Sequence, residues 1–188
     1  MNEGASGERP TSIVILGASG DLTKRKLMPA LFSLWRKGRL PERFRIVGFS
    51  RTEWSDDEYR AAMRDGLEEF ASFPYGDDEW VAFAARLSYL SGDLSDLDSC
   101  ECFAEELAAL EGQSCNRLYY LATPPQLIAE IVTHIGQKGL LDEEEGSRRV
   151  VVEKPFGWDL DSARRLNRLI HRQLDDSQIY RIDHYLVK

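Results

Sequence analysis

The densest group of chemically capable side chains lies at residues 183–188, where Asp183, His184, Tyr185 and Lys188 fall within six positions. They follow an apolar run at 178–182 that we expect to form a strand. Polar groups packed this closely at a strand end usually face a ligand. His184, Lys188 and the Tyr185 hydroxyl could hold a phosphate, and Asp183 could orient a histidine base. A lone histidine is more often a structural hydrogen-bonding group, but the cluster favours a functional site.

A second candidate is Lys154, which directly follows the expected strand at 149–153, with its apolar run at 150–152. The carboxyl end of a buried strand is where open α/β sheets bind ligands. Pro155 restricts the backbone after it, and the ammonium could donate to a sugar hydroxyl or a carboxamide. The alternative is a strand-end lysine in solvent.

A glycine-rich turn lies between an expected strand and an expected helix, and consists of Gly17, Ala18, Ser19, Gly20, Asp21 and Leu22. Such a turn lets a pyrophosphate approach the main-chain N–H groups at a helix N-terminus. The same tetrapeptide recurs at 4–7 without a strand before it or a helix after it, so only the second copy has the required context. A plain strand–helix turn is the alternative.

Arg51 ends the next expected strand, and no acidic residue occurs at 48–52. Folds that bind NAD tend to place an acid here for the ribose hydroxyls, whereas folds that bind NADP place an arginine for the 2′-phosphate. The position therefore favours NADP, and a solvated surface arginine is the alternative.

The elements that must position these residues alternate along the chain. Strands are expected at 12–16, 44–49, 87–90, 117–122, 149–153 and 178–182, and helices at 21–37, 55–72, 77–86, 96–110, 125–138 and 159–173. Most of the strands are continuously apolar, as strands buried on both faces are. The pattern predicts an α/β fold: a Rossmann-like, doubly wound parallel sheet with helices on both faces.

Local signals refine this plan. Leu27, Leu31 and Leu34 form an apolar stripe on the first expected helix, and Gly38 ends it. Ser55 and Glu58 predict a capping box at the second. We expect residues 1–10 to be a disordered leader and residues 11–188 to form one dinucleotide-binding domain.

Composition limits the classes of partner. A net charge of −8 argues against nucleic acid or an anionic membrane as the main partner. No apolar run reaches membrane-spanning length, and the first ten residues contain no signal-peptide apolar region. Three cysteines without zinc spacing predict free thiols in a reducing cytoplasm, and no metal site is expected.

Four stretches together resemble glucose-6-phosphate dehydrogenases, specifically their N-terminal coenzyme domain, over residues 12–188. They are residues 17–22, 120–125 (Tyr-Leu-Ala-Thr-Pro-Pro), 153–157 (Glu-Lys-Pro-Phe-Gly) and 181–186 (Arg-Ile-Asp-His-Tyr-Leu), in the family's order and approximate spacing. The last two are specific in combination, whereas the glycine turn alone is not.

The resemblance implies oxidation of glucose 6-phosphate to a lactone with hydride transfer to NADP. By the same resemblance, residues from Gly17 to Lys24 hold the pyrophosphate, Arg51 holds the 2′-phosphate, and Asp93 and Leu94 lie near the adenosine. Lys154 contacts sugar and coenzyme, His184, Tyr185 and Lys188 hold the substrate phosphate, and Asp183 pairs with the catalytic histidine. A cis peptide bond between Lys154 and Pro155 is also implied.

Two departures from the family pattern qualify these expectations. Val187 replaces a family glycine and could displace Lys188. The family's large second domain, with its base histidine and much of the interface of its homo-oligomers, has no counterpart here, so we expect the 188-residue polypeptide alone to be inactive.

A non-catalytic NADP-binding module or relic is the alternative. Another sugar oxidoreductase with a similar Glu-Lys-Pro strand end is a third possibility, which the Asp-His-Tyr cluster disfavours.

Overall fold

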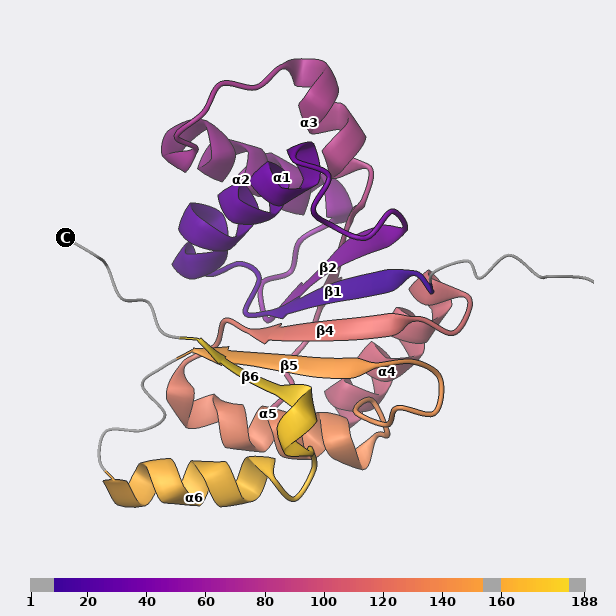
Figure 1. Cartoon of the computed structure of the whole chain (residues 1–188), viewed down its shortest axis with the longest axis vertical. Helices are drawn as coiled ribbons and strands as arrows, with labels where there is room; N and C mark the ends of the chain where they lie inside the picture. The colour runs from indigo at the N-terminus through magenta and orange to yellow at the C-terminus, as the bar shows by residue number, and fades with distance from the viewer. Residues whose placement is uncertain (1–8, 154–159, 183–188) are drawn as a thin grey trace, which may run out of the picture.

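The computed structural model describes residues 9–153 and 160–182, which contain a six-stranded sheet in the order β3-β2-β1-β4-β5-β6 (Figure 1). The strands are β1 Thr11–Leu16, β2 Phe44–Ser50, β3 Leu87–Ser91, β4 Asn116–Leu121, β5 Arg148–Glu153 and β6 Ile179–Ile182. Every neighbouring pair is parallel, so all carboxyl ends meet at one edge. The predicted doubly wound parallel sheet is confirmed.

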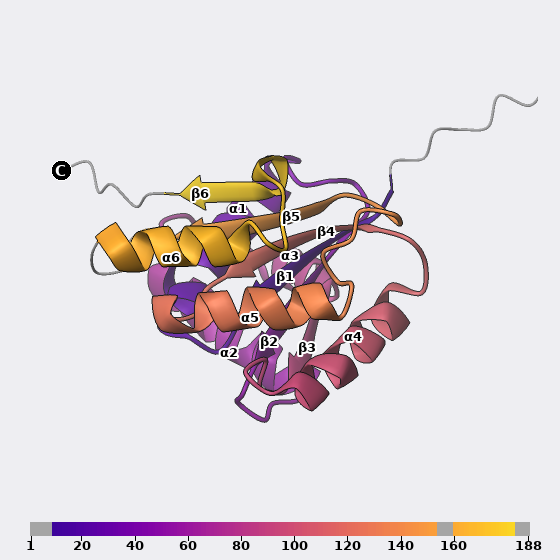
Figure 2. The same cartoon turned by 90° about the horizontal axis from the view of Figure 1, so that it is seen from below.

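Helices cover both faces of the sheet (Figures 1 and 2). They are α1 Met28–Arg36, α2 Asp56–Phe70, α3 Asp77–Ala84, α4 Leu97–Glu111, α5 Pro125–Gln137 and α6 Leu160–Ile170. The first three lie on one face and the last three on the other. A short 3₁₀ segment, Asp176–Gln178, leads into β6.

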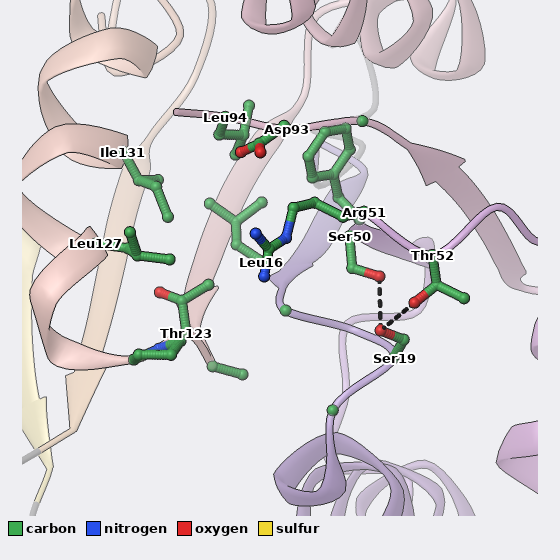
Figure 3. Close-up of a pocket in the computed structure, with 16 residues that line it drawn as sticks. Leu16, Ser19, Ser50, Arg51, Thr52, Asp93, Leu94, Thr123, Leu127 and Ile131 are labelled. Carbon is green, nitrogen blue, oxygen red and sulfur yellow. Dashed lines mark hydrogen bonds between the residues drawn. The ribbon is translucent and has the colours of Figure 1, made fainter. Parts of the chain in front are cut away.

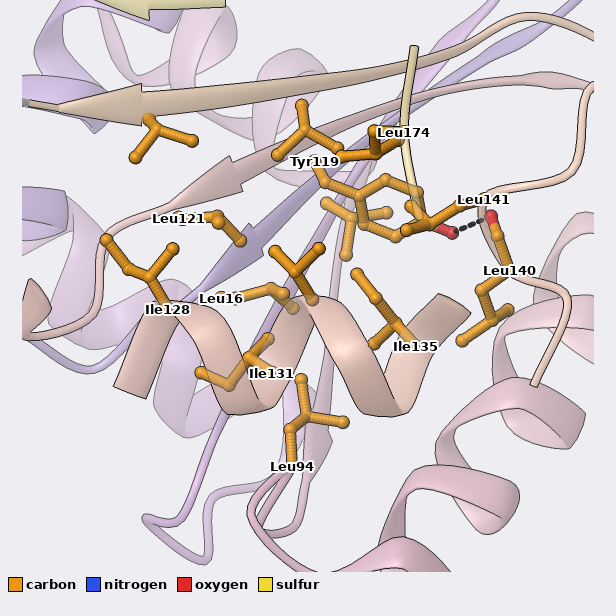
Figure 4. Packing of buried hydrophobic residues seen from close by; sticks show 14 of the residues in the cluster. Leu16, Leu94, Tyr119, Leu121, Ile128, Ile131, Ile135, Leu140, Leu141 and Leu174 are labelled. Atoms are coloured by element: carbon orange, nitrogen blue, oxygen red, sulfur yellow. Dashed lines mark hydrogen bonds between the residues drawn. The ribbon is translucent and has the colours of Figure 1, made fainter. Parts of the chain in front are cut away.

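Two apolar clusters sit on opposite faces of the sheet, and β1 contributes to both. Ile13 and Ile15 join the cluster under α1–α3, whereas Val14 and Leu16 join the cluster under α4 and α5 (Figure 4). Successive strand residues point to opposite faces, which explains why this strand is apolar throughout. Burial on both faces holds the carboxyl end of β1 in a fixed position.

The first helical segment differs from the prediction. A π-helical turn, Thr23–Leu27, precedes α1, and the buried residues of α1 are Met28, Pro29 and Phe32. The expected stripe is only partly right: Leu27 and Leu31 pack against the core, whereas Leu34 is 36% exposed. A π turn adds a residue relative to α-helical bonding and so rotates the following helix about its axis.

Local signals at the next elements are confirmed. Ser55 accepts a hydrogen bond from the Glu58 N–H at 3.2 Å, and Glu58 accepts from the Ser55 N–H at 2.7 Å, which completes the capping box of α2. Gly38 has a φ of +60° just past α1, the left-handed conformation typical of a helix C-terminus. The three cysteines are free, as expected. Among the described residues no helix has the length and apolar character needed to cross a bilayer.

Candidate coenzyme site

A cavity of about 350 Å³ opens at the carboxyl edge of β1, β2 and β4 (Figure 3). The strand order reverses between β1 and β4, and this switch point is where open α/β sheets bind ligands. Its lining comprises Leu16, Gly17, Ser19, Gly20, Phe49, Ser50, Arg51, Thr52, Gly92, Asp93, Leu94, Ala122, Thr123, Pro124, Leu127 and Ile131.

The floor of the cavity is the turn after β1. Gly17 has a φ of +94°, and a Cβ there would overlap the carbonyl oxygen of Ala122. Only glycine fits, because both the dihedral and the close approach exclude a side chain. The first backbone bond of the helical turn that follows runs from the Lys24 N–H to the Gly20 carbonyl at 3.2 Å. The N–H donors that precede it belong to a helix start, which suits an anion.

Three hydroxyl groups meet beside this turn. Ser50 and Thr52 both donate to Ser19 Oγ, each at 2.8 Å (Figure 3). Because Ser19 Oγ accepts twice, its own proton is available for a third group in the cavity. Sequence reasoning missed Ser50 and Thr52 as site residues, although both flank Arg51.

Arg51 is exposed, and Figure 3 shows its side chain extending over the cavity. Its guanidinium makes no hydrogen bond or ion pair with any residue that the structure describes. Asp93 also lines the cavity, and its Oδ1 accepts from the Ser95 hydroxyl at 2.7 Å and from the Ser95 N–H at 3.0 Å. These bonds, and to a smaller degree the charge of Arg51, lower the pKa of Asp93. The cavity therefore carries one cation without a protein partner among those residues and one stabilised carboxylate.

The opposite wall is apolar. Leu16 from β1 and Leu127 and Ile131 from α5 face the cavity, with Leu94 at its edge (Figure 3). His134 Nδ1 donates to the Leu94 carbonyl at 2.7 Å and so ties this edge to α5. A flat ring could lie against this wall while its polar groups reach Asp93.

The end of β4 contributes Thr123, whose hydroxyl is buried without a partner among the described residues. It belongs to the stretch 120–125, to which sequence analysis gave no individual roles. Nearby, the Tyr120 hydroxyl donates to Glu153 at the end of β5. Burial first, and then the Glu153 carboxylate, raise the pKa of Tyr120.

The structure gathers part of the predicted coenzyme set: Gly17, Ser19, Gly20, Arg51, Asp93 and Leu94 all line the cavity. Ala18, Asp21, Leu22 and Lys24 do not. Ala18 is buried in the core under α1–α3, and Asp21 forms an ion pair with Arg25 at 3.3 Å. Lys24 packs along Gly66 of α2.

The predicted sugar and phosphate residues, namely Lys154, Asp183, His184, Tyr185 and Lys188, lie outside the described residues, as do Val187 and the Lys154–Pro155 bond. Their roles stay predictions.

A family model for the glucose-6-phosphate dehydrogenase NAD-binding domain matches residues 14–188. The chain belongs to this family. It is 39% identical over 186 residues to glucose-6-phosphate 1-dehydrogenase of Chlamydia pneumoniae, covering 95% of this chain and 36% of that protein. It is 42% identical over 187 residues to the enzyme of the same name from Aggregatibacter actinomycetemcomitans, covering 94% and 36%.

A solved glucose-6-phosphate dehydrogenase in complex with its substrate glucose-6-phosphate superposes with a TM-score of 0.79 at 35% identity. The match covers 95% of this chain and 37% of that one. The chain thus spans little more than a third of the length of these glucose-6-phosphate dehydrogenases.

Proposed function

We propose that the chain binds NADP in this cavity and is the coenzyme-binding part of a dehydrogenase that oxidises glucose 6-phosphate to 6-phosphoglucono-lactone. The observation that carries the proposal is the group at the end of β2: Arg51 beside the hydroxyls of Ser19 and Thr52. A guanidinium and converging hydroxyl donors suit a phosphate, which only accepts hydrogen bonds.

The rest of the cavity supports the same ligand. The turn at Gly17 and Gly20 leaves room for a pyrophosphate at a helix start, and the apolar wall suits an adenine ring. Bound NADP would supply the hydride acceptor. The protein side chains would bind and orient it, with Arg51 holding the 2′-phosphate and Asp93 and Leu94 beside the adenosine.

The substrate half of the proposal rests on family membership. We propose that Lys154 contacts sugar and coenzyme, that His184, Tyr185 and Lys188 bind the phosphate of glucose 6-phosphate, and that Asp183 orients the histidine that acts as base. That base is not among the matched motifs of the 188 residues, and removal of the hydroxyl proton requires one. The polypeptide alone should therefore bind NADP without oxidising the sugar.

The test uses the purified 188-residue polypeptide. Calorimetric titration with NADP should show saturable binding, and addition of glucose 6-phosphate should give no NADPH absorbance above background. Robust NADPH formation by these 188 residues would contradict the proposal that a histidine outside them acts as the base. Absence of saturable binding by either NADP or NAD would contradict the coenzyme site itself.

A further inference from the structure

We infer that Tyr89 is a positioning residue that sets the preference for NADP by holding the segment Ser50–Thr52, which carries Arg51. The inference rests on the proposed NADP site and adds a residue outside its lining. Tyr89 lies on β3 and is 6% exposed, so it acts through its neighbours rather than by touching the coenzyme.

The Tyr89 hydroxyl contacts the residue on each side of Arg51. It lies 2.7 Å from Ser50 Oγ, and it donates to the Thr52 carbonyl at 2.7 Å. Ser50 donates its one proton to Ser19 Oγ, so the single Tyr89 proton is shared between the Thr52 carbonyl and Ser50 Oγ. One phenol thus connects the backbone around Arg51 to the hydroxyl cluster on the cavity wall.

This segment needs such a support because the sheet stops holding it. The β2–β3 pairing ends at Ser50 and Ser91, and the Gly92 N–H donates to the Ser50 carbonyl at 3.0 Å. Arg51 and Thr52 lie beyond that ladder. The bond from Tyr89 to the Thr52 carbonyl therefore fixes the backbone where sheet hydrogen bonding has ended.

The ring that carries this hydroxyl is itself held firmly. It packs against Tyr59 and Trp54, with centroid distances of 4.9 and 5.8 Å. The Tyr89 N–H also donates to Asp56 Oδ1 at 2.7 Å. A fixed ring places its hydroxyl at one point, and a preorganised contact costs little on binding.

The consequence differs between the two coenzymes. NADP presents a 2′-phosphate to Arg51 and Ser19, whereas NAD has a hydroxyl there and depends less on where Arg51 lies. Loosening the segment should therefore weaken NADP binding and leave NAD binding almost unchanged.

Tyr89→Phe tests this inference, because it removes the hydroxyl and keeps the ring packing. We expect calorimetry to show NADP affinity reduced roughly three- to ten-fold, as for loss of one or two neutral hydrogen bonds, and NAD affinity within about two-fold of the wild type. Tyr59→Phe is the matched control: its ring lies in the same cluster, and its hydroxyl is buried without a partner among the described residues. It should change neither affinity.

The outcomes separate the two proposals. Suppose that the wild type prefers NADP. If Tyr89→Phe then weakens the binding of both coenzymes equally, through unfolding or general loosening, or weakens the binding of neither, the inference fails and the NADP site stands. If wild type does not prefer NADP, both fail. A double-mutant cycle with Ser50→Ala gives a second measurement: a non-additive loss of NADP affinity supports coupling through Ser50, and strict additivity overturns it.

Discussion

Charge at one residue position determines which coenzyme the cavity should favour. Arg51 extends over a cavity whose other polar side chains nearby are hydroxyls, while the carboxylate of Asp93 is bound by Ser95. A charge-assisted contact to a phosphate is worth more than a neutral hydrogen bond. Removing the guanidinium should therefore affect the phosphorylated coenzyme selectively.

Arg51→Ala should weaken NADP binding by roughly 1.5–3 kcal/mol, the usual range for a hydrogen bond to a charged group. NAD binding should stay nearly the same, because NAD has no 2′-phosphate. Calorimetry with both coenzymes checks the prediction. Arg39→Ala, an exposed arginine in the loop after α1, is the control and should change neither value. Equal losses of NADP and NAD affinity would contradict the assignment of Arg51 to the 2′-phosphate.

Gly17 should matter for both coenzymes. Gly17→Ala adds a Cβ that overlaps the Ala122 carbonyl and also strains a backbone with a φ of +94°. We expect a loss of roughly 2–4 kcal/mol in unfolding free energy and weaker binding of NADP and NAD alike.

Gly38→Ala separates the two causes, because Gly38 also has a positive φ but has no atom within 4 Å of an added Cβ. It should cost about 1 kcal/mol from backbone strain alone. If denaturant unfolding shows equal losses of unfolding free energy for Gly17→Ala and Gly38→Ala, the close packing at Gly17 does not contribute.

Turns and strand ends form the site, and helices and strands hold them in place. The strands could be predicted from sequence because parallel strands buried on both faces are continuously apolar, as β1 nearly is. The glycine turn and Arg51 could be predicted because their chemistry depends on a strand end close in sequence.

Other features could not be predicted from sequence. The π turn before α1 has no pattern of its own at Thr23–Leu27, and beyond it Met28, Pro29 and Phe32 rather than Leu34 are the buried residues of the helix. The contact between Ser19 and Ser50 joins residues 31 positions apart and exists only because β1 pairs with β2. Tyr89 reaches this cluster from β3, a third element.

A buried ion pair ties α4 to β4. Arg117 donates to both carboxylate oxygens of Glu111, at 3.0 and 3.1 Å from Nε, and both side chains are largely buried. Burial is the largest single influence and acts to raise the pKa of Glu111, but the hydrogen bonds and charge of Arg117, together with contacts to Cys115 and Ser12, outweigh it and lower that pKa. The stabilisation from this carboxylate is therefore complete at neutral pH and is lost as the pH falls through the lowered pKa.

Arg117→Met should destabilise the fold by roughly 3–5 kcal/mol, because it leaves Glu111 buried without its partner. Adding Glu111→Leu should recover most of that loss, since an apolar pair of similar volume replaces the ion pair. Urea unfolding at neutral pH measures both variants. If Arg117→Met alone is as stable as the wild type, water reaches Glu111 and the ion pair does not hold α4 to β4.

At the scale of the whole molecule, the described residues leave one part of the sheet less covered than the rest. Tyr120, Val151 and Tyr180 form one row across β4, β5 and β6, and Tyr180 is 52% exposed. Figure 1 shows α1–α3 lying over the other half of this face. Apolar area of this kind favours association.

The 188-residue polypeptide should therefore self-associate at high concentration. Tyr180→Lys should weaken that association by about ten-fold, because it places a charge on the apolar row. Analytical ultracentrifugation measures it, with Val81→Lys as control, since Val81 is 64% exposed on α3, away from the row. A wild-type polypeptide that stays monomeric at the highest attainable concentration would contradict the prediction.

The most direct test of the whole account is the ratio of NADP to NAD affinity of the unmodified chain, measured by calorimetry under one salt condition. The geometry around Arg51, Ser19 and Thr52 predicts one saturable NADP site per chain, bound at least about ten-fold more tightly than NAD. Equal affinities would contradict the role of this group, and no saturable binding of either coenzyme would contradict the site.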